Sequence, residues 1–476
     1  MPTSASASPR VVVLGGGPGG YEAALVAAQL GARTTVVDAD GLGGAAVLTD
    51  CVPSKTLIAT SDVMTEVAEA GRLGVVLPVG GSEPAGGVGT RVGVDMKAVN
   101  ARVKELARTQ SADIHRKLDL AGVELVTGRG RLESPHRVVA GTADGERVLD
   151  ADAVLLATGA TPRRLPSAVP DGERILDWRQ VYDLDTLPER LVVVGSGVTG
   201  AEFAGAYLAL GSRVTLVSSR DRVLPGEDAD AALVLEEVFR RRGMDVRSRS
   251  RAQSVTRTAD GVVVTLGDGT RVEGSHCLLA VGSVPNTADL GLEAAGVRTT
   301  ESGHVEVDRV SRTTAPGVYA AGDCTGVLAL ASVAAMQGRI AMRHALGDAV
   351  VPLSLKTVAS NIFTTPEIAT VGWSQAEIDA GAAQGVAIHL PLATNARAKM
   401  QGLQEGFVKL FSRTGSGTVI GGVVVAPRAS ELIYPITLAV EHRLTVDQVA
   451  RAFTVYPSLS GTIGEAARQL HPAPLL

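Results

Sequence analysis

The strongest constraint on the fold of this chain is an internal repeat of one β-α-β pattern. Residues 11–38 (VVVLGGGPGGYEAALVAAQLGARTTVVD) and residues 191–218 (LVVVGSGVTGAEFAGAYLALGSRVTLVS) are identical at 12 of 28 aligned positions. Each copy begins with a β-branched run, continues through G-x-G-x-x-G into an alanine-rich stretch, and ends in a second β-branched run. These runs predict buried strands on either side of a helix. Gly31 and Gly211 follow the alanine-rich stretches and are expected to end the two helices.

The spacing of the glycines in each repeat has a specific physical reason. The first glycine allows a sharp turn from strand to helix, the second lets the backbone approach a pyrophosphate, and the third lets the helix pack on the strand. The helix N-terminus then directs free N–H groups and a partial positive charge at the phosphates. The residues that this spacing predicts to bind dinucleotide phosphates are Gly15, Gly17 and Gly20 in the first copy and Gly195, Gly197 and Gly200 in the second.

The residue that ends the second strand of each repeat differs between the copies. Asp38 lies 23 residues after Gly15, and a carboxylate there accepts hydrogen bonds from the hydroxyls of an unphosphorylated adenosine ribose. The matching residue of the second copy is Ser218, and Arg220 and Arg222 come shortly after it. Losing the carboxylate removes repulsion against a 2′-phosphate, and arginines pair well with one. We therefore expect the second site to accept NADPH as well as NADH; the alternative is that both arginines are solvated loop charges.

Composition excludes several other classes of protein. The chain has 476 residues, 45% hydrophobic and 20% charged, as in an ordinary globular protein of several domains. Its net charge of −5 does not suggest a nucleic-acid-binding surface. Three cysteines are too few for a disulfide framework or a zinc cluster. No apolar run approaches the ~18 residues of a membrane span and no secretory signal is present, so we expect a cytoplasmic protein. We also expect no metal site. The glycine-rich Pro78–Arg91 is expected to be an exposed loop.

Two further strand ends complete a pattern that resembles a known family. Residues 154–159 (VLLATG) and 318–323 (VYAAGD) are strands ending in small-residue turns, and an acid at such an end can bind ribityl or ribose hydroxyls. From about Arg10 to Arg468, the chain resembles the pyridine nucleotide–disulfide oxidoreductases of the dihydrolipoamide dehydrogenase and glutathione reductase type. The motifs that carry the resemblance, in chain order, are Gly15–Gly20, Cys51–Lys55 (CVPSK), Thr158-Gly159, Gly195–Gly200, Gly282–Asn286 (GSVPN), Gly322-Asp323 and Pro366–Ala369 (PEIA).

The resemblance implies an α/β fold with two Rossmann-like dinucleotide-binding domains and an α+β C-terminal dimerisation domain. It assigns an FAD-binding domain to residues 1–163 and 287–348, an NAD(P)-binding domain to residues 164–286, and the interface domain to residues 349–476. We expect residues 421–425 (GGVVV) to form a core strand of the last domain. The resemblance further implies a homodimer.

The same resemblance assigns site residues. It implies FAD contacts at Gly15, Gly16, Gly17, Pro18, Gly19, Gly20, Asp38, Lys55, Gly130, Thr158, Gly159, Asp323 and Ala331. It implies nicotinamide-nucleotide contacts at Gly195, Gly197, Gly200, Glu202, Ser218 and Gly282. Lys55 and Glu202 match the ion pair that the family places beside flavin N5.

The chain departs from the family where the dithiol chemistry belongs. The family's first redox cysteine is replaced by Ala46, so only Cys51 of that pair remains. In the family's H-P-T-x-x-E block, Tyr456 replaces the histidine and Gly461 the glutamate. A dithiol mechanism needs a base with a pKa near 7, and a tyrosine with its usual pKa near 10 does not supply it. The dinucleotide motifs are complete, so the pattern indicates an enzyme that keeps the reduction of flavin and has changed the second half-reaction.

The resulting hypothesis is an FAD-dependent NAD(P)H:quinone oxidoreductase, because quinones accept electrons without a dithiol relay. The alternatives are a soluble NAD(P) transhydrogenase and a non-catalytic flavoprotein redox sensor. Candidate catalytic residues are Lys55, Glu202, Cys51 and Tyr456. Cys51 is either a flavin-contacting thiol or a packed relic, and Tyr456 either positions the acceptor or fills space left by histidine.

Overall fold

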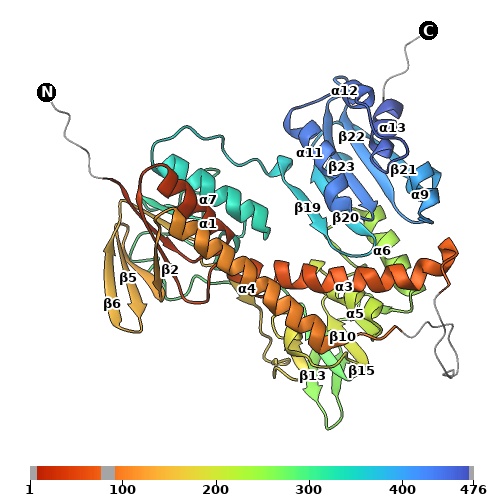
Figure 1. Ribbon diagram of the computed structural model, residues 1–476, viewed down its shortest axis with the longest axis horizontal. Coiled ribbons are helices and arrows are strands. Elements are labelled where there is room, and N and C mark those ends of the chain that lie inside the picture. Colours follow the sequence, from red (N-terminus) through yellow and green to blue (C-terminus); the bar gives the residue numbers. More distant parts are fainter. Residues whose placement is uncertain (1–7, 77–91, 471–476) are drawn as a thin grey trace. The chain divides into compact units, whose positions relative to one another are not determined.

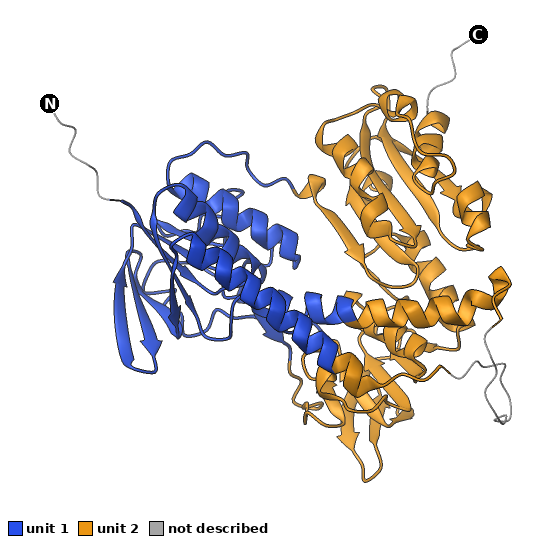
Figure 2. Ribbon diagram, viewed as in Figure 1, with its two compact units in different colours: residues 1–56, 101–163, 282–354 blue, residues 57–100, 164–281, 355–476 orange. Residues whose placement is uncertain are grey.

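The computed structural model describes residues 8–76 and 92–470, and the chain divides into two compact units (Figure 2). The first unit comprises residues 1–56, 101–163 and 282–354, and the second comprises residues 57–100, 164–281 and 355–476. The predicted loop Pro78–Arg91 lies outside the described residues. The finer division into an FAD-binding, an NAD(P)-binding and an interface domain stays a prediction.

A five-stranded parallel sheet forms the centre of the first unit (Figure 1). Its strands, in spatial order, are β18 (Val318–Ala320), β7 (Ala153–Leu156), β1 (Arg10–Leu14), β2 (Arg33–Asp38) and β3 (Glu124–Thr127). Residues 11–14 of β1 are almost completely buried, as expected for a parallel strand whose two faces are both covered. Helices α1 (Pro18–Gln29) and α7 (Ala331–Ala345) contribute Ala23 and Ala341 to the same core. Their small side chains let the helices pack closely.

Smaller elements complete the first unit. An antiparallel sheet contains β4 (Arg129–Ser134), β5 (Arg137–Thr142) and β6 (Gly145–Asp150), and β8 (Ala160–Pro162) pairs with β17 (Ser283–Pro285). The short helix α2 (Gly44–Leu48) precedes α3 (Cys51–Glu69), and α4 (Met96–Leu120) leads into β3. Helices α3 and α4 each continue across the boundary between the residues of the two units.

The second unit repeats the parallel sheet. Its strands, in spatial order, are β12 (Asp245–Arg247), β11 (Arg213–Val217), β10 (Arg190–Val194), β16 (His276–Leu279) and β9 (Ile175–Asp177). Helices α5 (Val198–Leu210) and α6 (Ala229–Arg241) come after β10 and β11, and β13 (Ala252–Arg257), β14 (Val262–Leu266) and β15 (Arg271–Gly274) form an antiparallel sheet. Gly31 and Gly211 stand just after α1 and α5 with φ of +84° and +113°, so their predicted role as helix stops is confirmed.

An antiparallel sheet forms the C-terminal part of the second unit, in the order β19 (Ala359–Ile362), β20 (Glu367–Gly372), β23 (Val419–Ala426), β22 (Phe407–Arg413) and β21 (Gly385–Pro391). Every residue of β23 is buried, which confirms the core strand expected at residues 421–425. The accompanying helices are α8 (Gln375–Asp379), α9 (Ala396–Met400), α10 (Ala429–Leu432), α11 (Tyr434–Glu441), α12 (Val446–Arg451) and α13 (Gly461–Gln469). The predicted combination of two parallel α/β sheets with an α+β C-terminal part is thereby confirmed.

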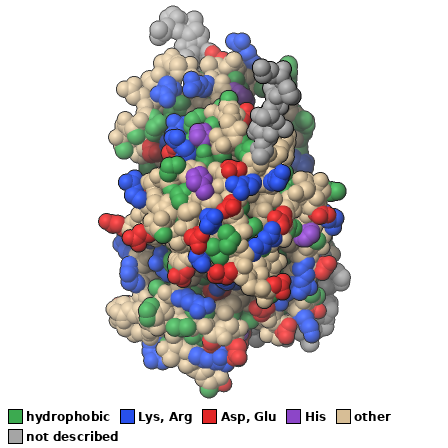
Figure 3. Space-filling model, turned by 90° about the vertical axis from the view of Figure 1, so that its left-hand side faces the viewer, with side chains coloured by type: hydrophobic (Ala, Val, Ile, Leu, Met, Phe, Trp, Pro, Cys, Tyr) green, Lys and Arg blue, Asp and Glu red, His purple; other side chains and the backbone are tan. Residues whose placement is uncertain are grey.

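The described surface and helices add three observations. Lys and Arg side chains are interspersed with Asp and Glu over the face shown in Figure 3. Within residues 8–76 and 92–470, no helix is long and apolar enough to cross a membrane. In the same part of the chain, no group of three or more His, Cys, Asp or Glu side chains is arranged to hold a metal ion.

Candidate dinucleotide sites

The glycine loop of the first unit turns from β1 into α1 in a shape that only glycine permits. Gly15 has φ of +103°, and a Cβ on it would overlap the carbonyl of Ala157. A Cβ on Gly20 would overlap the carbonyl of Gly15. Gly17 caps α1 without a side-chain hydrogen bond, and no acidic residue lies in the first helical turn. This positively polarised helix end is therefore suited to an anionic pyrophosphate.

Asp38, at the end of β2, closes this loop with its carboxylate. Its Oδ2 accepts from the Gly16 N–H at 2.7 Å, and its Oδ1 accepts from the N–H groups of Asp40 at 3.0 Å and Gly41 at 2.5 Å. A carboxylate offers about four acceptor positions, so three backbone donors orient it without exhausting it. The remaining acceptor positions of Asp38 fit the hydroxyl groups of an FAD ribose, and that contact stays a prediction.

The glycine loop of the second unit has the same backbone form. Gly195 has φ of +111°, and a Cβ on it would overlap the carbonyl of Ala280. A Cβ on Gly200 would overlap the carbonyl of Gly195, as at the corresponding glycine of the first loop. Gly197 caps α5 without a side-chain bond. The two loops can therefore accommodate the same pyrophosphate geometry.

Ser218 closes the second loop differently from Asp38. Its side chain is fully buried, and its hydroxyl lies 2.7 Å from the Ser196 hydroxyl and accepts from the Arg220 N–H at 3.1 Å. Ser218 thus fixes the start of the segment that carries the two arginines. Its own contact with a nucleotide stays a prediction.

Arg220 and Arg222 occupy different environments. Arg220 is exposed, whereas the buried Nε of Arg222 finds no hydrogen-bond partner among the described residues. A buried N–H donor without a partner is costly, and an anionic oxygen would satisfy it. The contact of Arg222 with a 2′-phosphate of NADPH stays a prediction.

The turn after β7 holds the predicted residues Thr158 and Gly159. The Thr158 hydroxyl donates to the carbonyl of Asn286 at 2.7 Å, and the Asn286 side-chain amide donates back to the carbonyl of Thr158 at 2.9 Å. Gly159 has φ of +69°, and Gly282, in the same unit, has φ of +90°. Sequence analysis did not identify Asn286 as this clamp, although it noted the motif to which Asn286 belongs.

Asp323 lies after β18 in a turn that a buried glutamine holds. The Gly322 N–H donates to Oε1 of Gln337 at 2.9 Å, and Gln337 is 1% exposed. Burial raises the pKa of the Asp323 carboxyl, and the nearby His304 partly offsets that rise. Sequence analysis missed Gln337. It lies on α7, the helix that begins at Ala331, whose predicted contact with FAD stays a prediction. Gly130, on β4, has no room for a side chain because a Cβ would overlap Leu14.

Lys55 and Glu202, the predicted ion pair, belong to different units, and their pairing stays a prediction. Glu202 lies on α5 and is 3% exposed. Its Oε1 accepts from the backbone N–H of Phe363 at 2.9 Å. Phe363 comes from the C-terminal part of the chain, and no sequence pattern near Glu202 indicates this contact.

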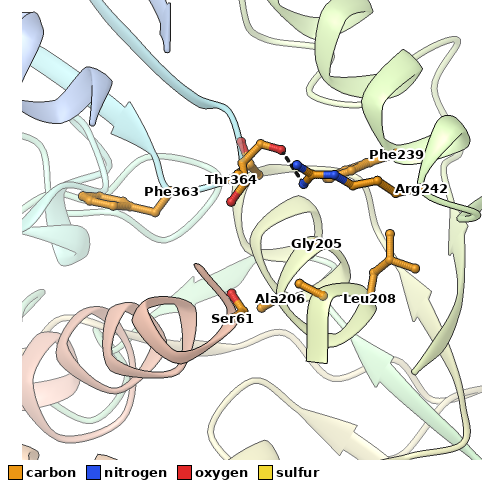
Figure 4. A pocket seen from close by; sticks show the side chains of 10 residues that line it. Ser61, Gly205, Ala206, Leu208, Phe239, Arg242, Phe363 and Thr364 are labelled. Atoms are coloured by element: carbon orange, nitrogen blue, oxygen red, sulfur yellow. Dashed lines mark hydrogen bonds between the residues drawn. The ribbon is translucent and has the colours of Figure 1, made fainter. Parts of the chain in front are cut away.

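A small pocket adjoins α5 one turn after Glu202 (Figure 4). Its volume is about 20 Å³, and Gly205, Ala206, Phe239 and Arg242 are among its lining residues. Arg242 donates to the Thr365 carbonyl at 3.0 Å. Ligand pockets usually measure at least about 300 Å³, so this pocket can admit a water molecule but not a nicotinamide or quinone ring.

The region of the lost dithiol chemistry contains no disulfide. Ala46 lies in α2, and the half-buried Cys51 begins α3 and forms no disulfide. Cys277 and Cys324 form no disulfide either and are buried. Burial raises the pKa of the Cys277 thiol far above its usual value and that of Cys324 to about 11, which keeps both protonated. Neither therefore replaces the missing thiol.

Tyr456 and Gly461 lie in the segment where the family has histidine and glutamate. Tyr456 is 86% exposed within the single chain. A Cβ on Gly461 would lie 3.6 Å from the Ser458 hydroxyl oxygen and 3.7 Å from that of Thr454, which are ordinary contacts. Packing does not require glycine there, so the absence of a carboxylate changes the chemistry rather than the shape.

Comparison with known proteins agrees with this geometry. Residues 9–338 match the family model described as pyridine nucleotide-disulphide oxidoreductase, and residues 358–467 match the model of its dimerisation domain. An NAD(P)H dehydrogenase (quinone) of Mycobacterium tuberculosis strain H37Rv is 58% identical over 471 residues, covering 97% of this chain and 94% of that protein. Dihydrolipoyl dehydrogenase of Bacillus subtilis is 31% identical over 457 residues, covering 96% and 97%.

Solved structures show the same architecture. The crystal structure of LpdA from Mycobacterium tuberculosis has a TM-score of 0.91 and 57% identity, covering 98% of this chain and all of that chain. The flavoprotein disulfide reductase RclA from Escherichia coli has a TM-score of 0.84 at 22% identity, covering 96% and 99%, and supports the fold alone.

Proposed function

This chain belongs to the pyridine nucleotide-disulphide oxidoreductase family, and from that premise we propose that it is an FAD-dependent NAD(P)H:quinone oxidoreductase. The observation that carries the proposal is a contrast within the chain. Both loops have glycines at positions where a Cβ would overlap a carbonyl, as a dinucleotide-binding turn requires, whereas positions 46, 456 and 461 lack the thiol, the base and the carboxylate of dithiol chemistry. The relative that is 58% identical over 97% of the chain, named NAD(P)H dehydrogenase (quinone), supports the same acceptor class.

Members of this family use FAD and NAD(P)H. FAD would be held by the first glycine loop with Asp38, by Thr158 and Gly159 in the turn that Asn286 clamps, and by Asp323. When bound, FAD supplies a group that accepts a hydride from NAD(P)H and passes electrons to an acceptor. The chain's own contribution is to hold the two nucleotides in place and to exclude water between them.

Several residues of the second unit would orient the nicotinamide nucleotide. The second glycine loop and the N-terminus of α5 would bind its pyrophosphate, and the free Nε of Arg222 would donate to a 2′-phosphate. Glu202, buried and fixed by the Phe363 N–H, would pair with Lys55 and compensate charge beside the reacting ring. Because no dithiol is present to relay electrons, a quinone that accepts them by direct contact is the acceptor class that fits.

We further propose that the protein works as a homodimer in the cytoplasm. The match of residues 358–467 to a dimerisation domain supports the dimer. Phe453, Val455 and Tyr456 are at least 78% exposed in the single chain, and a second copy would cover such apolar side chains. Three cysteines that form no disulfide suit a reducing compartment.

The proposal is tested with the purified, FAD-loaded protein. NADPH is mixed anaerobically with the enzyme, and benzoquinone, lipoamide or thio-NAD is then added as acceptor. We expect benzoquinone turnover to exceed lipoamide turnover by about 100-fold, or about 2.7 kcal/mol of barrier. Equal turnover of benzoquinone and lipoamide would reject the proposal.

The same experiment separates the alternatives. A soluble transhydrogenase, for which the missing carboxylate at Ser218 leaves room for both nucleotides, would reduce thio-NAD faster than benzoquinone. A non-catalytic flavoprotein sensor would not lose its yellow colour promptly when NADPH is added.

A further inference from the structure

Residues 218–228, here called the arginine loop, connect β11 to α6 and carry Arg220 and Arg222. The beginning of this loop is attached to the second glycine loop. The hydroxyls of Ser218 and Ser196 lie 2.7 Å apart, and the Leu224 N–H donates to the Ser196 carbonyl at 2.8 Å. This half of the arginine loop is therefore tied directly to the residues that approach the pyrophosphate.

The end of the arginine loop is attached to a different part of the chain. Asp228 caps α6, and its Oδ1 accepts from the N–H groups of Asp230 at 3.1 Å and Ala231 at 3.2 Å. Lys409 Nζ donates to both carboxylate oxygens of Asp228, at 3.0 and 2.8 Å, and to Asp230 Oδ2 at 2.7 Å. Lys409 lies on β22, inside the segment that matches the dimerisation domain.

This ion pair is buried. The side chains of Lys409 and Asp228 are 4% and 3% exposed. Removing two charges from water carries a desolvation cost that often exceeds the gain from pairing them, so such a pair is weak evidence for stability. A buried ion pair is better explained as a contact that holds two structural elements in one arrangement. Here it fixes the end of the arginine loop to the C-terminal sheet.

We propose that Lys409 is a positioning residue for nucleotide selectivity. By holding Asp228, it sets the end of the arginine loop so that Arg220 and Arg222 can meet the 2′-phosphate of NADPH. The dimerisation domain thereby takes part in choosing between NADPH and NADH. This inference rests on the proposed function, because it assumes that the second glycine loop binds NAD(P)H.

The test replaces Lys409 with methionine, which keeps most of the side-chain volume without the charge. Binding of NADP⁺ and NAD⁺ to the FAD-loaded full chain is measured by titration calorimetry, and KM and kcat are measured for NADPH and NADH with benzoquinone. We expect Lys409→Met to weaken NADP⁺ binding and raise the NADPH KM by about 10-fold, while NAD⁺ binding and both kcat values change by less than about 2-fold.

Two further variants and a control make the result interpretable. Asp228→Asn keeps a capping oxygen but loses the charge, so it should shift NADP⁺ binding in the same direction by a smaller factor. Lys409→Arg keeps the charge and should restore at least half of the lost selectivity. Lys356→Met is the control. It removes a lysine that pairs with Glu377 in the C-terminal part of the chain, and it should leave the ratio of NADP⁺ to NAD⁺ affinity unchanged. If Lys409→Met does not fold, Asp228→Asn decides the question, and an unchanged ratio of NADP⁺ to NAD⁺ affinity in that variant would overturn the inference.

The outcomes separate this inference from the proposed function. If the affinity for NADP⁺ and that for NAD⁺ fall equally, or neither changes, Lys409 has no positioning role and the inference is wrong. If the unmodified protein fails to bind either nucleotide or to reduce benzoquinone, the proposed function itself is wrong.

Discussion

The glycine loops of the two units share their backbone geometry but differ in the side chain that closes them. In both loops a Cβ on the first glycine would overlap a carbonyl from a neighbouring strand end, and a Cβ on the third would overlap the first glycine. The first loop is then closed by the Asp38 carboxylate, which accepts from three backbone N–H groups. The second is closed by the hydroxyls of Ser196 and Ser218. We therefore propose that the shared backbone sets where a pyrophosphate would lie in each loop, and that the closing side chain selects the ribose.

The largest effect is expected from breaking the shared backbone geometry in one loop only. Gly195→Ala places a Cβ against the Ala280 carbonyl at a residue whose φ is +111°. We expect kcat/KM for NADPH to fall by about 1,000-fold, or about 4 kcal/mol, while the FAD content stays unchanged. Stopped-flow reduction and the visible spectrum measure the two quantities.

The matched variant for that experiment is Gly197→Ala. A Cβ on Gly197 has no atom of the described chain within 4 Å. Gly197→Ala should therefore lower kcat/KM for NADPH less than Gly195→Ala does, because the added Cβ affects only the approach of the nucleotide. Equal losses in the two variants would show that the overlap with Ala280 is not what matters.

A second experiment converts the closing side chains of the second loop into those of the first. Ser196→Gly with Ser218→Asp rebuilds the pairing seen between Gly16 and Asp38. The new carboxylate should repel a 2′-phosphate and accept from ribose hydroxyls, shifting preference from NADPH toward NADH by about 30-fold, or about 2 kcal/mol. Steady-state KM values for both nucleotides measure the shift. An unchanged ratio would mean that the closing side chain does not select the ribose.

A third experiment removes the free donor of the arginine loop. Arg222→Gln should raise the NADPH KM by about 10-fold and leave the NADH KM within about 2-fold, because only NADPH has a phosphate to receive the donor. Arg213→Gln is the control, since Arg213 is 75% exposed and pairs with Glu189. A parallel rise in the KM of both nucleotides would contradict this role for Arg222.

The smallest effect is expected at Cys51, which comes after the first loop and has no counterpart after the second. If this thiol is a packed relic, Cys51→Ser should keep benzoquinone turnover within about 3-fold. A loss above about 100-fold, or about 2.7 kcal/mol, would instead give the thiol a direct role. Turnover is normalised to bound FAD so that a change in cofactor content is not mistaken for a change in rate.

The sequence predicted those features that depend on local backbone constraints. The repeat, the helix stops at Gly31 and Gly211, and the core strand at residues 421–425 arise from glycine and β-branched patterns, and the structure confirms them. Contacts between distant residues left no such pattern. Asn286 bonds to Thr158 across 128 positions and Lys409 to Asp228 across 181. Each of these contacts depends on how sheets and loops pack.

Ser218 has one feature that the sequence predicted and one that it did not. Its position after β11 correctly marks the end of the strand, because strand ends are set by the β-branched run. Its hydroxyl nevertheless points into the unit toward the Ser196 hydroxyl. In the turn that follows, the Arg220 N–H donates to the Ser218 hydroxyl, and the Arg220 carbonyl can accept from it. A residue's place along a motif is therefore more predictable than the direction of its side chain.

The fit at Gly461 bears on which substitutions this segment tolerates. A Cβ there would have only ordinary contacts with Ser458 and Thr454, so replacing this glycine with alanine should not strain the start of α13. Position 461 can therefore take a side chain without a change of backbone, in contrast to Gly195 and Gly200, whose Cβ atoms would overlap carbonyl groups. Backbone packing requires glycine in the loop after β10 but leaves position 461 open to substitution.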